Sequence, residues 1–348
     1  MSAVPDLPSL GWLPSFQQQL DLQEWESTHP QRIIEQHRSQ VDTLGAAGAL
    51  TLNLPPHFPP VCVGDWILCD AEGLPLRLLE RRGAFARKAA GHRVETQLIA
   101  ANVDTALIVC ALNRDFNLNR IERYLSLSHE AGAEPVVLLS KADLCPEAAD
   151  RQAEVQALDA RLSVLALDGR CATAAAALQP WCSRGQTLVL LGSSGAGKST
   201  LANTLLGEER QATGAIRADD DKGRHTTTRR TLIPLPGGAL LLDTPGMREL
   251  QLADCATGVA ATFADIDALT ADCRFNDCAH DTEPGCAVRA ALQAGELEQR
   301  RFDSYLKLHK EQALNAASLA QKRAGDRAQG RMYRSVQNAA RGRKGKTP

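Results

Sequence analysis

A glycine-rich segment near the middle of the chain constrains the fold more than any other feature. Residues 192–199, Gly-Ser-Ser-Gly-Ala-Gly-Lys-Ser, follow the apolar run Thr187–Leu191 and precede a helical pattern over Thr200–Leu206. This is the phosphate-binding loop pattern in the strand–loop–helix context that it requires. Successive backbone N–H groups of such a loop turn inward around a phosphate, at the positive end of the new helix. The segment therefore predicts a protein that binds a nucleoside triphosphate.

Two side chains of this loop have expected roles in the chemistry. Lys198 would reach the β- and γ-phosphates as a catalytic residue, and the Ser199 hydroxyl would bind Mg²⁺. The nucleotide-binding residues that we expect from the segment are Gly192, Ser193, Ser194, Gly195, Ala196, Gly197, Lys198, Ser199 and Thr200.

A second motif for the phosphate site follows the apolar run Ala239–Leu242. It reads Asp-Thr-Pro-Gly and occupies residues 243–246. A carboxylate at Asp243 can hold Mg²⁺ through water, and the N–H of Gly246 can bind the γ-phosphate. We therefore expect both residues to take part in binding the nucleotide, and Asp243 to bind Mg²⁺.

A polar segment between these two motifs suits a switch loop. Residues 223–228, Gly-Arg-His-Thr-Thr-Thr, are able to close on Mg²⁺ and the γ-phosphate, and we assign the Mg²⁺-binding role to Thr227. Met247 stands where a glutamine would orient the attacking water, so another group must do so. His225 is the nearest candidate for this catalytic role. An ordinary surface loop with a solvated histidine is the alternative interpretation.

The tetrapeptide Ser140–Asp143 indicates which base is bound. It closes the apolar run Pro135–Leu139 and nearly matches the Asn-Lys-x-Asp element by which GTPases read guanine. The Asp143 carboxylate can accept from the ring N–H and the exocyclic amine of guanine, and adenine offers neither in that position. The aliphatic stem of Lys141 can cover the base. Ser140 replaces the usual Asn, which predicts weaker binding of guanine.

The order of these motifs along the chain is unusual. An ordinary GTPase has the phosphate-binding loop first and the base-reading element last, whereas here the base-reading element comes first. A parallel sheet can be cut and rejoined elsewhere with its site intact. Apolar runs typical of buried parallel strands lie at Thr105–Leu112, Pro135–Leu139, Leu162–Leu167, Thr187–Leu191 and Ala239–Leu242. Helical patterns alternate with them, which indicates an α/β domain.

Three cysteines and a histidine cluster further along the sequence. Cys273, Cys278, His280 and Cys286 lie within 14 residues, and Pro284-Gly285 supplies a turn that brings the last cysteine back. Three Cys and one His complete a tetrahedral Zn²⁺ site, and a closed set of this kind is structural rather than catalytic. We therefore predict one structural Zn²⁺, with free or redox-active cysteines as the alternative. A helical pattern follows over Val288–Leu319.

Composition and charge narrow the class of protein. The longest apolar runs fall far short of the roughly 20 residues that span a bilayer, and the N-terminal residues lack the pattern of a secretory signal. We expect a cytoplasmic chain with reduced thiols and no membrane partner. The net charge is −2, but residues 321–348 hold nine basic residues and one acidic residue, so the preceding 320 residues carry −10. Such a tail is typical of nucleic-acid binding or of a solvated, disordered end.

The N-terminal third has a different sequence pattern from the α/β domain. From about residue 28 to residue 100, short apolar stretches such as Val61–Leu68 alternate with Pro and Gly, which is typical of a small β-barrel or sandwich. Residues 1–27 are polar and irregular, and we assign them no domain.

Taken together, these motifs resemble the circularly permuted small-ribosomal-subunit biogenesis GTPases of the RsgA type. The matching segments are SKAD at 140–143, GSSGAGKS at 192–199, GRHTTT at 223–228, DTPG at 243–246 and CRFNDCAHDTEPGCAVR at 273–289. His225 falls where that family has its proposed catalytic histidine, and Ala166-Leu167 fall where it has a second base-contacting pair.

The resemblance implies a multidomain α/β protein. An irregular extension over residues 1–27 would precede an OB-fold-like β-barrel over 28–100 and a circularly permuted P-loop GTPase domain over 101–262. A zinc-binding helical domain over 263–320 and a basic, flexible tail over 321–348 would follow.

The resemblance also implies a function. The enzyme would hydrolyse Mg²⁺-GTP, be stimulated by the small (30S) ribosomal subunit, and act late in the maturation of that subunit. Its partners would be GTP, the 30S subunit with its 16S-type rRNA, and other assembly factors, and we expect a monomer. Two alternatives come from other classes: a P-loop ATPase or kinase, and a GTP-controlled RNA-binding scaffold without significant turnover.

Overall fold

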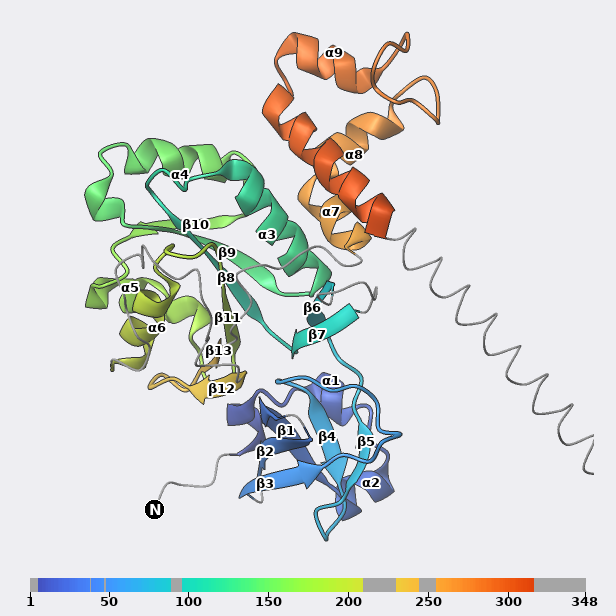
Figure 1. The fold of residues 1–348 in the computed structure, drawn as a ribbon, viewed down its shortest axis with the longest axis vertical. Helices are drawn as coiled ribbons and strands as arrows, with labels where there is room; N and C mark the ends of the chain where they lie inside the picture. Colours follow the sequence, from blue (N-terminus) through green and yellow to red (C-terminus); the bar gives the residue numbers. More distant parts are fainter. Residues whose placement is uncertain are drawn as a thin grey trace, which may run out of the picture.

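One mixed sheet runs through much of the molecule (Figure 1). The computed structural model describes residues 6–37, 39–46, 48–88, 96–208, 230–243 and 255–315. Within these residues the sheet has 11 strands. Their order is β10-β9-β8-β11-β13-β12-β1-β2-β3, with β4 paired to β1 and β5 paired to β4.

Five parallel strands form the part of the sheet that carries the phosphate-binding loop. They are β8 (Thr105–Ala111), β9 (Glu134–Ser140), β10 (Ser163–Leu167), β11 (Thr187–Leu191) and β13 (Leu240–Asp243). All five predicted apolar runs are therefore strands. A further strand, β12 (Thr231–Pro234), lies antiparallel to β13 and had no prediction.

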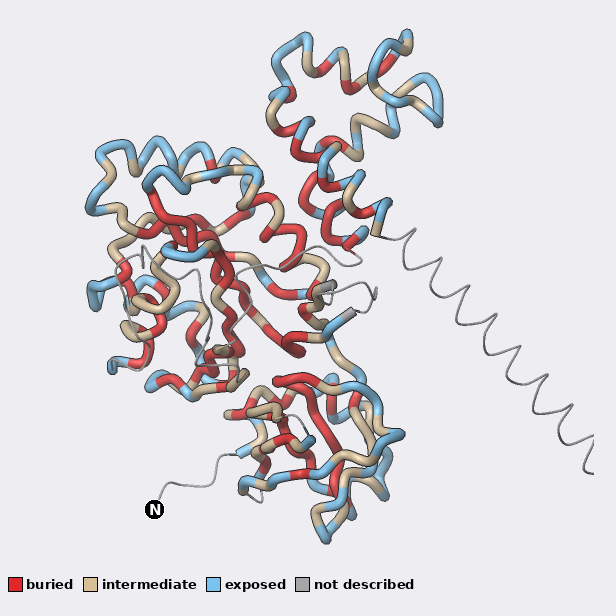
Figure 2. Tube along the Cα trace, viewed as in Figure 1, coloured by how far each residue is buried: buried red, intermediate tan, exposed pale blue. Residues whose placement is uncertain are grey.

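Side chains at alternate positions of these strands enter two different cores. Leu107 of β8 packs in the core that contains residues of α5 and α6, whereas Ile108 packs in the core that contains α3. The helical segments of this region are α3 (Leu118–Glu130), η2 (Ala142–Leu144), α4 (Ala148–Gln156), α5 (Ala172–Ala177), η3 (Gln179–Trp181) and α6 (Lys198–Leu206). Figure 2 shows the buried trace along the central strands. Because both faces of the sheet are covered, these strands are apolar throughout.

An antiparallel group of five strands precedes the parallel part. It consists of β1 (His29–Gln36), β2 (Gln40–Gly45), β3 (Gly48–Asn53), β4 (Trp66–Cys69) and β5 (Pro75–Leu78). Strand β1 joins the group together, because it pairs with both β2 and β4. It also reaches the parallel part, since Glu35 pairs with Thr231 of β12. A separate hairpin of β6 (Ala84–Lys88) and β7 (Thr96–Ala101) follows.

The N-terminal segment differs from the sequence prediction. The described part of residues 1–27 is not irregular, because it contains η1 (Leu7–Leu10), α1 (Pro14–Gln17) and α2 (Leu22–Ser27). Trp12 and Phe16 are buried against Trp66 of β4, and the Trp12 and Trp66 rings meet edge to face with centroids 4.9 Å apart. These contacts join residues far apart in sequence, so local patterns do not reveal them.

Arg32 of β1 links the antiparallel strands to the strand before the phosphate-binding loop. Its side chain is buried and donates hydrogen bonds to the Thr187 hydroxyl at 2.9 Å and to the Asn102 carbonyl at 3.2 Å. Burial lowers the pKa of Arg32 to about 10. Because Thr187 begins β11, this buried contact fixes the start of that strand.

Four helices follow in the described C-terminal part, and the first and the last of them pack on α3. They are α7 (Ala256–Thr262), α8 (Ala264–Ala271), α9 (Ala287–Ala294) and a helix over residues 299–315. The buried carboxylate of Glu122 on α3 pairs with Arg300 and Arg301, each at 3.1 Å. The single helical run predicted over Val288–Leu319 is wrong at Gly295, whose left-handed backbone (φ 74°) ends α9. Among the described helices, none is long and apolar enough to cross a membrane.

Candidate nucleotide site and metal centre

The phosphate-binding loop joins β11 to α6 at the carboxyl edge of the parallel strands, where sheets of this type bind ligands. Two of its glycines are required by the local geometry. Gly192 has a φ of 142°, and a Cβ there would lie 2.2 Å from the carbonyl oxygen of Val109. Gly197 caps α6 with a φ of 97°. The loop therefore follows a path that a chain with side chains at these positions would not adopt.

Lys198 is the first residue of α6, and its side chain folds back over the loop. Its ammonium group donates to the carbonyl oxygens of Gly192, at 2.7 Å, and Ser193. A positive charge is thus held inside the loop, next to the N-terminal end of a nine-residue helix. Both features favour an anion at this place. Ser199 and Thr200 follow in the first turn, and each is half-buried.

The base-reading segment is hydrogen-bonded to the phosphate-binding loop. Ser140 ends β9, and its hydroxyl donates to the carbonyl oxygen of Ala196 at 2.6 Å. The ammonium group of Lys141 donates to the carbonyl oxygen of Gly195 at 3.0 Å, from a left-handed backbone with a φ of 61°. Although Ser140 replaces the usual Asn, it ties the two loops together through its side chain.

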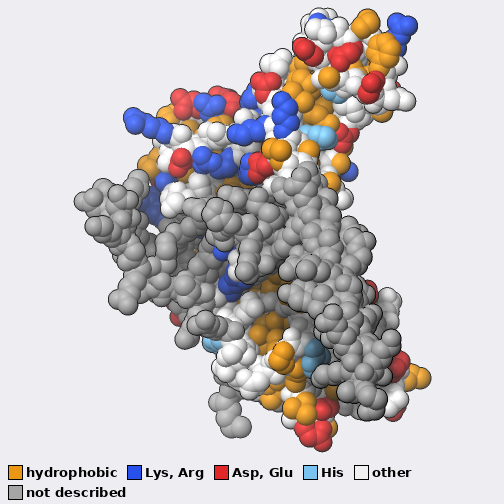
Figure 3. Space-filling view, turned by 45° about the vertical axis from the view of Figure 1, so that its right-hand side comes forward, with side chains coloured by type: hydrophobic (Ala, Val, Ile, Leu, Met, Phe, Trp, Pro, Cys, Tyr) orange, Lys and Arg blue, Asp and Glu red, His pale blue; other side chains and the backbone are white. Residues whose placement is uncertain are grey.

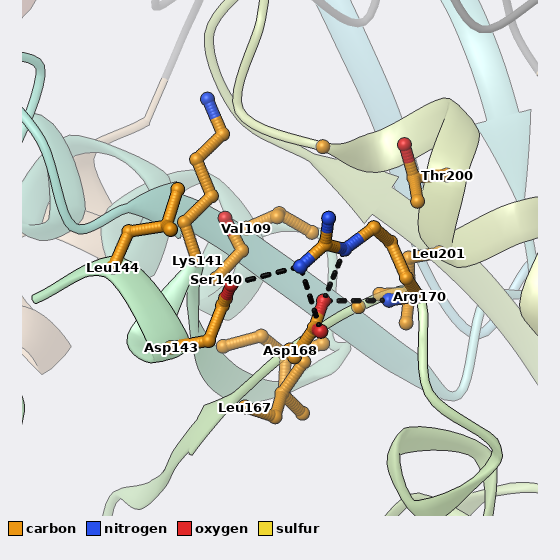
Figure 4. A pocket seen from close by; sticks show the side chains of 13 residues that line it. Val109, Ser140, Lys141, Asp143, Leu144, Leu167, Asp168, Arg170, Thr200 and Leu201 are labelled. Carbon is orange, nitrogen blue, oxygen red and sulfur yellow. Dashed lines mark hydrogen bonds and ion pairs between the residues drawn. The ribbon is translucent and has the colours of Figure 1, made fainter.

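A cavity of about 170 Å³ opens beside these two loops (Figure 4). Leu138, Leu167 and Leu201 give it apolar walls, whereas Lys141, Asp143 and Thr200 contribute polar groups. It has the composition of a small-molecule site, in which apolar walls hold a ring and a few polar groups fix its orientation. Asp143, the predicted guanine-reading carboxylate, lines this cavity.

A third segment of the cavity, Asp168–Arg170, had no prediction from the sequence. The residues expected there were Ala166 and Leu167, but only Leu167 lines the cavity, while Ala166 packs against the core. Leu167 lies opposite Ser140 in the parallel pairing of β10 with β9, so the residues after Leu167 face the base-reading segment. The expected pair Ala166-Leu167 directly precedes these residues in the sequence, and the strand register shows that the segment after it lines the cavity.

Charged groups of the new segment interact closely with Asp143. The Arg170 guanidinium donates from Nη2 to Asp143 at 2.8 Å and from Nε to Asp168 at 2.9 Å. Hydrogen bonds from the Arg170 side chain and backbone hold the pKa of Asp168 well below its usual range. The hydrogen bond with Asp168 in turn raises the pKa of Arg170.

Asp243, the predicted Mg²⁺-binding carboxylate, is the last residue of β13. Leu242 lies opposite Val189 of β11, so the next residue reaches the same sheet edge as the phosphate-binding loop. The structure thus brings Asp243, the phosphate-binding loop and Ser140–Asp143 to one edge. The predicted residues His225, Thr227 and Gly246 lie outside the described residues, as does the basic tail.

The four predicted zinc ligands come together in the C-terminal part. One ligand atom from each of Cys273, Cys278, His280 and Cys286 lies within 4.8 Å of the others. The Nδ1 atom of His280 is 3.6 Å from Sγ of Cys273 and 3.5 Å from Sγ of Cys286, and these two sulfurs are 3.9 Å apart. A tetrahedral zinc ion would separate its ligands by about 3.6 Å for sulfur and nitrogen and about 3.8 Å for two sulfurs. The cluster is therefore compatible with one Zn²⁺.

The surroundings of the cluster hold its ligands in place. Cys286 caps the N-terminus of α9. Partial burial raises the pKa of Cys273, but hydrogen bonds from the backbone N–H groups of Val288 and Ala287, together with those from the Cys286 and Cys278 side chains, lower it overall. His280 has a left-handed backbone with a φ of 60°, and its ring meets that of Phe302 edge to face. Such constraints are expected where ligands must be oriented before binding.

The fold and the site define a P-loop GTPase in which the base-reading strand precedes the phosphate-binding loop. The family model described as RsgA GTPase matches residues 78–253. The chain belongs to this family of GTP-hydrolysing enzymes. Enzymes of this class use Mg²⁺ with GTP. The alternative of an ATPase or kinase of another class is therefore set aside.

Related proteins align with nearly the whole chain. A protein of Vibrio parahaemolyticus named small ribosomal subunit biogenesis GTPase RsgA 2 is 52% identical over 343 residues, which cover 99% of this chain and 96% of that protein. A protein of Vibrio vulnificus with the same name is 54% identical, over 95% of each chain. The RsgA protein of Xanthomonas euvesicatoria is 48% identical, over 91% of each chain.

Two solved structures share the fold. That of YjeQ from Thermotoga maritima has a TM-score of 0.62 at 22% identity, and it covers 82% of this chain and 99% of that one. The structure of YloQ, a circularly permuted GTPase, has a TM-score of 0.59 at 23% identity, covering 82% of this chain and 95% of that one. The predicted circularly permuted GTPase fold is thus confirmed.

Proposed function

We propose that this chain hydrolyses GTP in late maturation of the small (30S) ribosomal subunit. It binds that subunit and its 16S-type rRNA, and the subunit stimulates hydrolysis. The observation that carries the proposal is the joining of the base-reading segment to the phosphate-binding loop through Ser140 and Lys141. The chain that holds this site is 52% identical over 99% of its length to a protein named for small-subunit biogenesis.

The cavity beside the phosphate-binding loop takes the guanine base. Asp143 accepts hydrogen bonds from the ring N–H and the exocyclic amine of guanine, which adenine cannot supply. The stem of Lys141 covers one face of the ring. Ser140 contributes by fixing the position of the segment rather than by reading the base, since its hydroxyl is used by Ala196.

The edge of the sheet next to the cavity takes the triphosphate. Lys198 leaves the carbonyl oxygens of its own loop and binds the β- and γ-phosphates, while the backbone N–H groups of residues 192–200 surround them. Mg²⁺ neutralises charge that develops on the phosphate oxygens. Its protein ligands in this proposal are Ser199, Thr227 and Asp243. Gly246 donates its N–H to the γ-phosphate.

Hydrolysis requires a group that orients the attacking water. We assign this role to His225, in the segment 223–228, which lies between α6 and β12 in the sequence. Contact with rRNA places His225 against the attacking water, which explains why the subunit would stimulate turnover. In the absence of the subunit, hydrolysis is slow because the water is not held in line.

The parts outside the GTPase domain (residues 101–262) bind the ribosomal subunit. Strands β1–β5 form an OB-like barrel within residues 28–100, and the cysteine cluster holds one structural Zn²⁺ within residues 263–320. The basic tail, residues 321–348, adds electrostatic attraction to rRNA. On the face drawn in Figure 3, Lys and Arg side chains lie beside the C-terminal helices, with Asp and Glu side chains among them. The protein acts as a cytoplasmic monomer, together with other assembly factors.

Co-sedimentation with ribosomal subunits tests the binding step. Purified protein is centrifuged with small or large subunits in the presence of a non-hydrolysable GTP analogue, GDP or the corresponding ATP analogue. We expect co-sedimentation with small subunits that is strongest with the GTP analogue, and little with large subunits. Equal co-sedimentation with both subunits, or no effect of the guanine nucleotide, would contradict the proposal.

A further inference from the structure

The strongest unexplained feature of the cavity is the position of the Arg170 side chain. Figure 4 shows its guanidinium between the two carboxylates of Asp143 and Asp168. Nη2 donates to Asp143 at 2.8 Å and to Asp168 at 3.0 Å, while Nε donates to Asp168 at 2.9 Å. Arg170 comes from the segment after β10, which the sequence motifs do not include.

The contact with Asp143 uses the same chemistry by which a carboxylate reads guanine. In guanine, the ring N–H and the exocyclic amine are attached to one carbon atom, and together they form a guanidine-like edge. The guanidinium of an arginine presents N–H donors in the same planar arrangement. A carboxylate that suits one of these groups therefore suits the other.

We propose that Arg170 is an internal ligand of the base site, which holds Asp143 when no nucleotide is bound and which guanine must displace. This inference rests on the proposed guanine site and adds a residue that sets its affinity. Oδ2 of Asp143 accepts from Arg170, and guanine requires both carboxylate oxygens of the same residue. Arg170 and guanine therefore compete for Asp143.

The local structure lets Arg170 leave Asp143 without losing all its partners. Two hydrogen bonds of Arg170 do not involve Asp143. Nε donates to the Asp168 carboxylate, and the backbone N–H of Arg170 donates to the same carboxylate at 3.0 Å. The Arg170 side chain is 66% exposed, so rotation toward solvent meets little obstruction. Asp168 thus keeps the guanidinium close to the cavity, ready to return when the nucleotide dissociates.

The competition is selective for guanine. Adenine offers no pair of donors to Asp143, so its binding gains nothing when Arg170 is removed. Removal of Arg170 also takes away the positive charge that Asp143 and Asp168 share. A ligand that donates hydrogen bonds to Asp143 then stabilises the negative charge of that carboxylate. Removal of the guanidinium should therefore raise the affinity for guanine nucleotides and leave the affinity for adenine nucleotides unchanged.

Equilibrium titration of the full-length protein with GDP and with ADP tests the proposal. The variants are Arg170→Ala and Arg170→Gln, which both remove the cation. Arg161→Ala is the matched control, because Arg161 is exposed and pairs with Asp159 outside the cavity. We expect GDP to bind about two- to fivefold tighter to both Arg170 variants, which corresponds to the contribution of one exposed ion pair. ADP binding should not change, and Arg161→Ala should match the wild type.

The salt dependence of GDP affinity gives a second test of the competition between Arg170 and guanine. An exposed ion pair is screened as ionic strength rises, so Arg170 should compete less well at high salt. The difference in GDP affinity between the wild type and Arg170→Ala should therefore shrink between about 0.05 M and about 0.5 M salt. A difference that stays constant or grows would contradict the competition.

The possible failures are distinguishable. If the wild type binds GDP and both Arg170 variants bind it equally well or more weakly, the proposal that Arg170 competes with guanine is wrong. Weaker binding would mean that Arg170 holds the base. Equal tightening of GDP and ADP would also overturn it, because the effect would then not act through Asp143. If the wild type binds neither GDP nor GTP, the guanine site itself is wrong.

Discussion

The hydroxyl of Ser140 donates a hydrogen bond to the backbone carbonyl of Ala196 over 2.6 Å, across 56 residues of sequence. This bond joins the segment that we propose reads the base to the loop that we propose holds the phosphates. Each of the two segments lies at the carboxyl end of a parallel strand, β9 or β11. The hydrogen bond fixes the distance between the two segments. In the proposed function, the two ends of a nucleotide are therefore bound by segments that are directly hydrogen-bonded to each other, although these segments occur along the chain in the reverse of the usual order.

Ser140→Ala should weaken GDP binding and lower the stability of the protein. It leaves the Ala196 carbonyl without this donor in a buried place, so the free energy of unfolding should fall by about 1–3 kcal/mol. GDP should bind about two- to tenfold more weakly, as measured by titration. The control is Ser128→Ala, which removes a buried hydroxyl that donates to the Tyr124 carbonyl outside the site. A Ser140→Ala protein with wild-type GDP affinity would show that the two loops are not coupled.

Asp143→Asn should change the choice of base. The amide keeps the size of the side chain but replaces one acceptor with a donor, which repels the donors of guanine. We expect GDP to bind about 10- to 100-fold more weakly, and XDP, which carries an oxygen in place of the exocyclic amine, to bind better than it does to the wild type. Titration with both nucleotides measures the change. An unaltered preference for GDP would remove Asp143 from the base site.

Cys286→Ser should reduce the zinc content of the purified protein from one equivalent per chain to much less. The variant replaces one thiolate of a closed set, and metal binding by such a set contributes directly to folding. The midpoint of thermal unfolding should fall with the loss of metal. Elemental analysis checks the first effect and calorimetry the second. Cys145→Ser, outside the cluster, is the control and should keep its zinc; zinc in Cys286→Ser at the wild-type level would contradict the assignment.

The stability of the protein should decrease on mild acidification, partly through His129. Burial lowers the pKa of His129 in the last turn of α3 below its usual value of 6.5. The unfolded chain therefore binds a proton more readily than the folded one, so stability is lost as pH falls below about 6.5. Urea unfolding at about pH 7.5 and about pH 5.5 should show a smaller loss for His129→Gln than for the wild type. Equal losses would exclude His129 as a contributor.

The sequence predicts the parallel strands and the phosphate-binding loop because each has a strong local signal. Strands covered on both faces are apolar at every position, as Thr105–Ala111 shows, and the glycines of the loop are required by its backbone. The ligands of the cysteine cluster also follow from spacing, because a short loop limits how far apart they can lie.

The remainder could not be predicted because it depends on contacts between distant residues. The N-terminal helices have four to six residues each. The first two are held by the packing of residues such as Phe16 on Trp66, and α2 is held by the ion pair of Glu24 with Arg77. Strand β12 has only four residues, and it is held between β13 and β1. The segment Asp168–Arg170 belongs to no motif, and only the pairing of β10 with β9 places it in the cavity.

Steady-state GTP hydrolysis, with and without small ribosomal subunits, tests the central claim most directly. The purified protein is assayed with GTP and with ATP, alone, with small subunits and with large subunits. We predict slow GTP turnover that rises sharply with small subunits only, and negligible ATP turnover under all conditions. GTP turnover that does not respond to small subunits, or ATP turnover equal to that of GTP, would contradict a guanine-specific enzyme that acts on the small subunit.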